Sequence, residues 1–310
     1  MIAVLTGACA SPAQTPATGA RSHGDVGVAG AGVDGGPGVG TGWGQLAGGE
    51  DEARPDASSA DGGEKAGKPE SQAELAKQLQ NPVANLISVP IQSNWDYDIG
   101  PAHTRNYVAK VQPVIPVSIS EDWNVIVRTI VPVIWTQSPV DKNDTKFGLG
   151  DTVQSFFFSP KAPTSDGWIW GVGPVFQWPT STSDELGNGK TGAGPTALIL
   201  KQECGWTYGV LANHIWSFAG QDNTSDVNST FVQPFLSYTT ATNTTFAVNT
   251  ESTYDWEERQ WTTPFNASVS QLVKIGGLPV QFQIGYRYYA HTPYGGPDWG
   301  IRFGITLLFK

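Results

Sequence analysis

From about Leu86 to Lys310 the chain repeats one pattern, a run in which apolar and polar side chains alternate, followed by a turn. The last run, Trp299–Phe309, is the clearest, because all its odd-numbered residues are apolar and its even-numbered residues are mostly small or charged. Successive side chains of a β-strand point to opposite faces, so such a run has one apolar face. That face is the core of a soluble sandwich or the lipid-facing surface of a transmembrane barrel, whose other face lines the lumen.

The composition favours the membrane alternative. Charged residues make up only 15% of the chain, whereas a soluble domain averages about 25%. The 12 Trp and 37 Gly residues are typical of a β-barrel with aromatic girdles at the membrane interfaces. No apolar run approaches the ~20 residues of a membrane-spanning helix. The net charge of -10, without any Lys/Arg cluster, argues against nucleic acid as a partner.

The alternating runs predict twelve strands, an even number as in bacterial single-chain barrels. They are longer than the usual five or six residues of globular strands, as a tilted membrane crossing requires. The expected strands span 86–98, 104–119, 123–137, 147–159, 167–180, 192–203, 205–218, 229–241, 244–257, 261–275, 279–291 and 297–309.

The connections between these runs alternate in length. Every odd-numbered connection is a polar loop, as in 138–146 and 181–191, and most even-numbered connections are tight turns, as in 242–243. Outer-membrane barrels have long external loops and short periplasmic turns. The alternation therefore predicts an outer-membrane barrel with both termini in the periplasm.

The faces of most runs can be assigned, but two observations resist the pattern. The fourth and sixth runs are ambiguous, and prolines occur inside several strands, where each removes a ladder hydrogen bond. These prolines are Pro90, Pro113, Pro132, Pro174 and Pro234.

Residues 1–70 are rich in Gly, Ala, Pro, Ser and Asp. Such a segment buries too little apolar surface to offset its ordering entropy, so we expect a disordered low-complexity leader. Its first residues, Met1–Ser11, are typical of the remnant of an export signal peptide. Cys9 stands where a lipoprotein cleavage site would have its cysteine, but no basic residue precedes it.

Residues 71–82 are expected to form a short helix before the barrel, which then spans residues 83–310. Ser71 and Glu74 make a capping box, and Asn81-Pro82 ends the helical pattern. This helix could lie at the periplasmic rim or plug the lumen, and a helical leader without either role is the simpler interpretation.

Charged residues on the polar faces are the candidate lumen residues. The principal candidates for a lumen constriction are Asp96, Asp98, Lys110, Arg128, Glu251, Asp255, Glu257, Arg287 and Arg302, and the wider set adds Asp151, Lys201, Glu203 and Lys274. Four of them, Asp96, Asp98, Asp255 and Glu257, are expected to form an acidic group near the outer end, opposed by Arg287. Such a group would give a weak preference for cations or polar neutral solutes, screened by salt. The alternative for each residue is an ion pair that only fills the interior.

The sequence offers little support for catalysis. Hydrolytic outer-membrane barrels place a His and a Ser on one strand face, which needs an even offset. None of the four histidines has Ser two residues later, and His214 and Ser217 are three apart. We expect no catalytic residues, no cofactor and no metal site, since neither a phosphate-binding loop nor a paired-Cys motif is present.

Several segments together resemble a known family. They include Asn81–Pro90, Gly148–Pro160, Ala212–Gly220 and Asn249–Trp256. They are similar to a family of uncharacterised Gram-negative outer-membrane proteins often labelled "transporter" or "neuromedin U", which looks related to the outer-membrane family of phenol meta-pathway degradation. The resemblance covers about Leu75 to Lys310, and implies an outer-membrane barrel and solute passage without assigning catalytic residues.

The sequence therefore predicts an all-β, twelve-stranded antiparallel transmembrane barrel in the outer membrane. Its expected partners are the lipid bilayer, lipopolysaccharide, the barrel assembly machinery and a small-molecule solute. The favoured function is a narrow channel or transporter for small solutes, hydrophobic or aromatic ones included. The alternatives are a structural or surface-interaction barrel without conductance and, less favoured, an outer-membrane lipid hydrolase.

Overall fold

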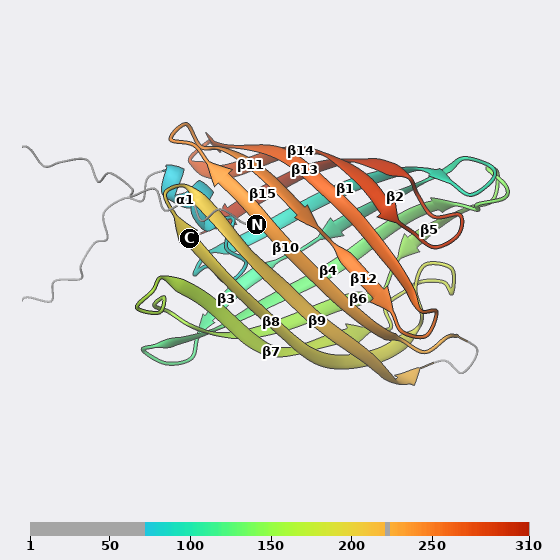
Figure 1. The fold of residues 1–310 in the computed structure, drawn as a ribbon, viewed down its shortest axis with the longest axis horizontal. Helices are drawn as coiled ribbons and strands as arrows, with labels where there is room; N and C mark the ends of the chain where they lie inside the picture. The colour runs from blue at the N-terminus through green and yellow to red at the C-terminus, as the bar shows by residue number, and fades with distance from the viewer. Residues whose placement is uncertain (1–71, 221–223, 310) are drawn as a thin grey trace, which may run out of the picture. The chain divides into compact units, whose positions relative to one another are not determined.

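Antiparallel pairing closes the sheet into a twelve-stranded barrel (Figure 1). The computed structural model describes residues 72–220 and 224–309. Nine strands are continuous, and three are each interrupted once, giving the pairs β2/β3, β5/β6 and β11/β12. Their bounds are β1 Ile87–Ile99, β2 Thr104–Val111, β3 Val114–Ser118, β4 Trp123–Gln137, β5 Thr145–Leu149, β6 Thr152–Pro160, β7 Trp168–Trp178, β8 Lys190–Glu203, β9 Trp206–Gly220, β10 Asn228–Thr239, β11 Thr244–Thr250, β12 Ser252–Asp255, β13 Gln260–Ile275, β14 Leu278–His291 and β15 Trp299–Phe309.

The predicted strands and their connections are confirmed. Every strand begins and ends within two residues of its expected position. The connections at one end, here called the short-turn end, have two to seven residues, as in 204–205 and 276–277. Those at the other end, here called the long-loop end, have four to eleven residues, as in 138–144 and 179–189. Strand β1 begins and strand β15 ends at the short-turn end (Figure 1).

A short helix, α1 (Gln72–Gln78), lies at the short-turn end (Figure 1). Its last turn continues through a hydrogen bond from the Leu79 backbone N–H to the Leu75 carbonyl, 3.0 Å. The helix agrees with the expected one, although Ser71 and the 1–70 leader lie outside the described residues. No helix in the described part of the chain has the length and apolar character needed to cross a membrane.

Large apolar side chains cover the outside of the barrel. Residues such as Ile199, Phe246 and Ile284 are about half exposed although each lies within a paired strand. Aromatic contacts gather near both strand ends, with Tyr97 stacked on Trp299 at the long-loop end and Trp206 against Tyr238 at the short-turn end. An apolar belt between two aromatic girdles is the surface of a barrel that spans a membrane.

The strand prolines lie where the sheet is interrupted or where two of them meet. Pro113 separates β2 from β3. Pro174 of β7 faces Pro195 of β8. Neither residue has a backbone N–H, so both missing hydrogen-bond donors fall at the same position of the β7–β8 pairing. The register of β11 with β13 places Pro264 opposite Glu251, the residue between β11 and β12. Pro132 of β4 lies opposite Gly150, between β5 and β6, so a proline lies at each of the three strand interruptions.

One side of the lumen is packed with apolar side chains. Ile126 of β4, Phe157 of β6 and Leu200 of β8 are fully buried and belong to one apolar cluster. Val83, in the segment after α1, packs in the same cluster. The strands that sequence left ambiguous, β5/β6 and β8, belong to this side. Their apolar residues occur on both faces because one face meets lipid and the other this interior cluster.

Candidate functional site

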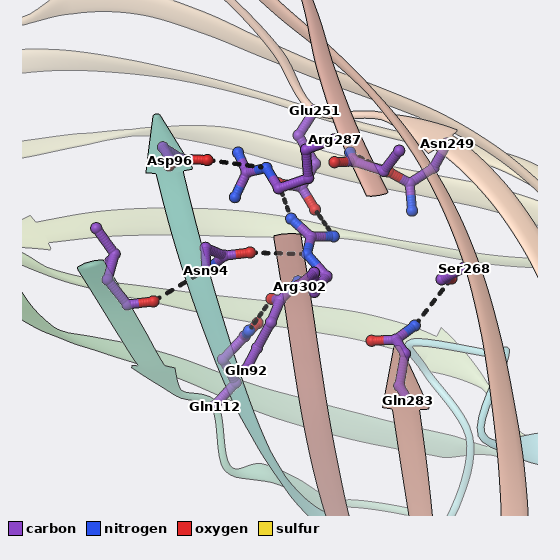
Figure 2. Close-up of polar contacts among 12 residues, drawn as sticks. Gln92, Asn94, Asp96, Gln112, Asn249, Glu251, Ser268, Gln283, Arg287 and Arg302 are labelled. Carbon is purple, nitrogen blue, oxygen red and sulfur yellow. Dashed lines mark hydrogen bonds and ion pairs between the residues drawn. The ribbon is translucent and has the colours of Figure 1, made fainter. Parts of the chain in front are cut away.

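The opposite side of the lumen is polar and carries the charged residues. Antiparallel register sets Asn94 of β1 beside Arg302 of β15, and Arg287 of β14 beside Gly300. Gly300 leaves the space that the Asp96 carboxylate occupies, since a Cβ there would collide with it. Small residues on the inward face of β15 therefore allow neighbouring long polar side chains to lie across the wall. Figure 2 shows this group of residues.

Arg302 and Glu251 form a two-point ion pair inside the barrel (Figure 2). The two terminal nitrogens of Arg302 donate to the two Glu251 oxygens at 2.8 and 2.9 Å, and its Nε donates to Asn94 at 2.8 Å. The Arg302 side chain is only 4% exposed. Paired, planar contacts of this kind are among the strongest polar interactions in proteins, so they fix the Arg302 guanidinium in the lumen.

Arg287 forms a second, looser pair with Asp96. Its Nε lies 3.6 Å from the Asp96 carboxylate, and one terminal nitrogen donates to the Tyr289 hydroxyl at 2.7 Å. The 3.6 Å separation satisfies an ion pair but exceeds hydrogen-bond length. Both side chains are at most one-tenth exposed. The positive charge of Arg287 is thus less completely satisfied than that of Arg302.

Two further cations, Arg128 and Lys110, face the same space. Arg128 of β4 donates to the Gln112 amide oxygen at 2.8 Å, and the Gln112 amide nitrogen donates to Gln92 at 2.8 Å. The other end of the Gln92 amide lies beside Arg302, so the Gln112 and Gln92 amides lie between the two guanidinium groups. Lys110 of β2 interacts electrostatically with Glu251 and with all three arginines.

These six residues are here called the lumen charge cluster: Asp96, Lys110, Arg128, Glu251, Arg287 and Arg302. The cluster contains four cations and two carboxylates, so its formal charge is positive by two. A charge held between low-dielectric walls acts over a longer range than one in bulk water. The lumen charge cluster therefore makes this part of the wall a region of net positive formal charge.

Three of the four residues of the predicted acidic group lie at the long-loop rim. Asp98 adopts a left-handed φ of 61° at the long-loop rim and accepts a hydrogen bond from the Trp299 indole at 2.8 Å. Asp255 caps the following turn through the backbone N–H groups of Glu257 and Glu258. Glu257 accepts from Asn228 at 3.2 Å in the same rim region. The three carboxylates are held by local contacts at this rim, and the cation preference expected from an acidic group there stays a prediction.

The wider set of charged candidates also lies outside the cluster. Lys201 and Glu203 form an ion pair of 3.0 Å near the short-turn end, joined there by the Tyr208 hydroxyl. Lys274 is exposed at the end of β13. Asp151 is a loop anchor: its carboxylate accepts backbone N–H groups of Ser181, Asn188 and Gly189.

Neutral amides complete the polar wall, and sequence reasoning missed their role. Asn266 donates to Asn249 at 2.8 Å, and Gln283 donates to Ser268 at 3.0 Å (Figure 2). Each lies on the inward face of its strand, beside the charged residues. A search restricted to charged side chains omits them, whereas the alternation of polar with apolar residues in Asn266–Ser270 of β13 and Gln281–Gln283 of β14 would have indicated them.

A cavity of about 220 Å³ lies between the lumen charge cluster and the segment that follows α1. Its walls combine residues 78–82 with inward side chains of the barrel, including Gln112, Arg128, Asn249 and Gln281. The helix itself is held by Leu75 and Ala76, which pack on Leu272 and Leu308. Helix α1 and the segment after it therefore cover the lumen at the short-turn end.

At the long-loop end, the connection 179–189 folds back onto the barrel. The Thr182 backbone N–H donates to the Leu149 carbonyl at 3.0 Å, and Leu186 is buried. Lys146 forms an ion pair of 3.2 Å with Glu185. The pKa of Glu185 is lowered by its own backbone N–H and by the hydrogen bond from Lys146. This loop is thus anchored to β5 at the long-loop end.

The histidine best placed in a strand lies on the membrane side. His214 shares the outward face of β9 with Trp216, its ring 3.9 Å from the indole, and its Nδ1 is 2.7 Å from the Thr230 hydroxyl. Ser217 instead contacts Asp226 at 3.3 Å. The two residues therefore have separate partners, as their odd spacing predicts.

Solved structures of outer-membrane barrels are similar to this chain. An outer-membrane channel from Pseudomonas putida F1 matches with a TM-score of 0.59 and 14% identity, covering 73% of this chain and 96% of that one. The NanC porin gives a TM-score of 0.47 at 13% identity, covering 72% and 99%. Outer membrane phospholipase A from Escherichia coli gives 0.42 at 11% identity, covering 77% and 98%.

Comparison of the sequence itself adds no assignment. No family model matches the chain, and no curated protein matches it. At 14% identity, the likeness to the Pseudomonas channel shows the barrel fold alone. The family resemblance noted in the sequence stays a prediction.

Proposed function

We propose that this chain is an outer-membrane channel that passes small polar solutes along the polar side of its lumen and favours anions over cations. The observation that carries the proposal is the lumen charge cluster, in which four cations face two carboxylates. A channel wall of one predominant charge raises the local concentration of solutes of the opposite charge. The preference should weaken as salt rises, because the screening length falls to about 8 Å at physiological ionic strength.

Polar solutes are favoured over the hydrophobic or aromatic ones also considered from the sequence. The apolar side of the lumen is closed by contacts among its own side chains and with Val83. Open space in the lumen adjoins the amides and Arg128 instead. The route for a solute therefore runs along the polar wall.

Passage requires α1 to leave its place at the short-turn end, which we assign to the periplasm. Leu75 is the one large side chain of α1 that is fully buried there, with Leu79 partly buried beside it. Burying one leucine contributes about 1.5–3 kcal/mol. A contribution of this size to the binding of α1 is compatible with α1 leaving the lumen during a single-channel recording.

The test is a selectivity measurement on the full chain in a planar lipid bilayer with a KCl gradient. We expect the reversal potential to have the sign of a chloride-selective channel. Arg128→Gln and Lys110→Gln should each shift it toward the equilibrium potential of potassium. The matched control is Lys142→Gln, which changes an exposed loop lysine. A potassium-selective current, or equal shifts in all three variants, contradicts the proposal. Silence of a folded protein, even after α1 is displaced, favours the structural barrel.

A further inference from the structure

The cavity beside Arg128 has the features of a solute-binding site. Two of its polar atoms, the Gln281 amide nitrogen and the Ser237 hydroxyl, are buried and have no hydrogen-bond partner within the described part of the chain. Gln281 is 8% exposed and Ser237 4%. Buried polar groups are nearly always paired, so an unpaired donor and an unpaired hydroxyl beside an open space indicate a missing partner.

Arg128 gives this space a positive charge. One of its terminal nitrogens donates a hydrogen bond to Gln112. The carboxylate that interacts with it electrostatically is Glu251, which is already bound at both oxygens by Arg302. The remaining N–H groups of Arg128 suit a carboxylate, since a guanidinium binds planar anions at two points.

The rest of the wall is suited to hydroxyl groups. Asn249, Gln233 and Gln281 contribute amides, which present both donors and acceptors. A hydroxyl also donates and accepts, so amides and hydroxyls satisfy one another. The cavity of about 220 Å³ corresponds to about seven waters at ~30 Å³ each, which is room for a monosaccharide-sized solute.

We propose that this cavity binds a small hydroxylated carboxylate, with the carboxylate on Arg128 and hydroxyls on Gln281, Ser237 and Asn249. The proposal rests on the channel function, because it names the solute class that pauses in the lumen. The segment 78–82 forms the wall of the site toward the short-turn end.

The test is calorimetric titration of the full chain in detergent with three probes. Gluconate carries a carboxylate and hydroxyls, glucose only hydroxyls, and acetate only a carboxylate. We expect gluconate to bind at least tenfold more tightly than either of the others. Arg128→Gln should weaken gluconate about ten- to a hundredfold, since a hydrogen-bonded charge is lost, and leave glucose nearly unchanged.

A second variant keeps the test decisive if Arg128→Gln fails to fold. Gln281→Leu removes an unpaired donor, so it should weaken both gluconate and glucose about threefold to tenfold while sparing acetate. The control is Arg105→Gln, because Arg105 stacks on Trp135 outside the cavity, 5.5 Å from the ring centre.

Failure of the site and failure of the channel give different results. No heat with gluconate, equal affinity for all three probes, or an equal loss in the Arg105 variant overturns the binding site. If the same protein still conducts in a bilayer, the channel proposal stands without it. Saturable gluconate binding in a protein that stays silent supports the site and overturns the channel.

Discussion

Glu251 and Arg302 join two distant parts of the barrel wall through hydrogen bonds of 2.8 and 2.9 Å. Glu251 lies between β11 and β12, where the opposite residue is Pro264 and the ladder is weakened. Arg302 lies in the centre of β15, paired with β1 and β14. The pair thus supports the sheet at an interruption and determines how many cations of the lumen stay unpaired.

Glu251→Gln should destabilise the barrel and strengthen its anion preference. Removing one partner of a buried ion pair leaves an uncompensated charge, at a cost of about 3–5 kcal/mol. The same change raises the formal excess of positive charge in the lumen by one. Urea unfolding in detergent measures the stability, and the reversal potential in a bilayer measures the selectivity.

The matched control for this pair is Glu251→Gln combined with Arg302→Gln. The double variant removes both charges, so its stability should recover part of the loss and its selectivity should return toward that of the unmodified chain. If the two changes add without coupling, the geometry seen here does not describe an energetically significant pair.

Most of the fold could be read from the sequence, because most strands obey a period of two with one face in lipid. The last strand illustrates this: its odd residues, such as Ile301 and Phe303, face outward, and Arg302 faces inward. Alternation failed for Leu198–Leu200 in β8, where Leu198 and Leu200 join the interior apolar cluster and Ile199 faces lipid. Apolar contacts on both sides leave no alternation to detect.

The candidate site was only partly predictable. Alternation places Arg287 and Arg302 inside, but it cannot reveal that Asp98 adopts a left-handed backbone and contacts Trp299 at the rim. Nor can it reveal that Asp255 caps its own turn. Distance along the barrel axis depends on register between strands, and register depends on pairing that a single strand does not specify. The lumen charge cluster has an excess of positive charge because these carboxylates lie outside it, at the rim.

Asp151→Asn should release the loop 179–189 from the barrel mouth. The Asp151 carboxylate accepts three backbone N–H groups of that loop, the shortest at 2.7 Å. Hydrogen bonds to a charged group contribute about 1.5–3 kcal/mol, so loss of the charge should raise amide exchange in 179–189 at least tenfold. Hydrogen-exchange mass spectrometry on the folded protein measures this.

The control for the loop variant is Asp184→Asn, which changes an exposed carboxylate of the same loop. Its exchange should match that of the unmodified chain. Unchanged exchange in Asp151→Asn would mean that Thr182 and Leu186 hold the loop without the carboxylate.

The loop before β10 should loosen in acid. The hydrogen bond and positive charge of Lys190, with help from Ser217, hold the pKa of Asp226 below its ordinary value of 3.8. Because the pKa of Asp226 is lower in the folded protein, the contact contributes its full stabilisation at pH values above the ordinary pKa. This stabilisation is lost as the pH falls through the lowered pKa. Hydrogen exchange around residues 224–227, corrected for intrinsic rate, should therefore accelerate a few-fold below about pH 4.

Two variants test whether Asp226 causes that acid response. Asp226→Asn should show the faster exchange already at pH 7, with no further step in acid. Asp144→Asn alters a different exposed loop and should keep the step. Persistence of the full acid response in Asp226→Asn would assign it to another group.

Leu75→Asp should open the barrel at its short-turn end. Leu75 is 3% exposed and packs with Ala76 on Leu272 and Leu308. Placing a carboxylate in that apolar seat costs more than the ~1.5–3 kcal/mol that the leucine contributes, so α1 should leave it. A shift of this size raises the open-to-closed ratio by about tenfold or more, which single-channel open time in a bilayer measures.

The control is Lys77→Gln, a charge change two residues later on α1 that leaves Leu75 in place, and it should keep the closed fraction of the unmodified chain. The barrel should stay folded in Leu75→Asp, because its strands pair without α1, and heat-modified migration on a gel checks this. Two further hydrogen bonds hold the helix, from Gln202 to the Lys77 carbonyl at 2.8 Å and from Asn243 to Gln72 at 3.2 Å. If Leu75→Asp alone changes nothing, adding Gln202→Leu should release the helix. Unchanged open time in that double variant would show that α1 does not limit passage, and the constriction would then lie at the lumen charge cluster.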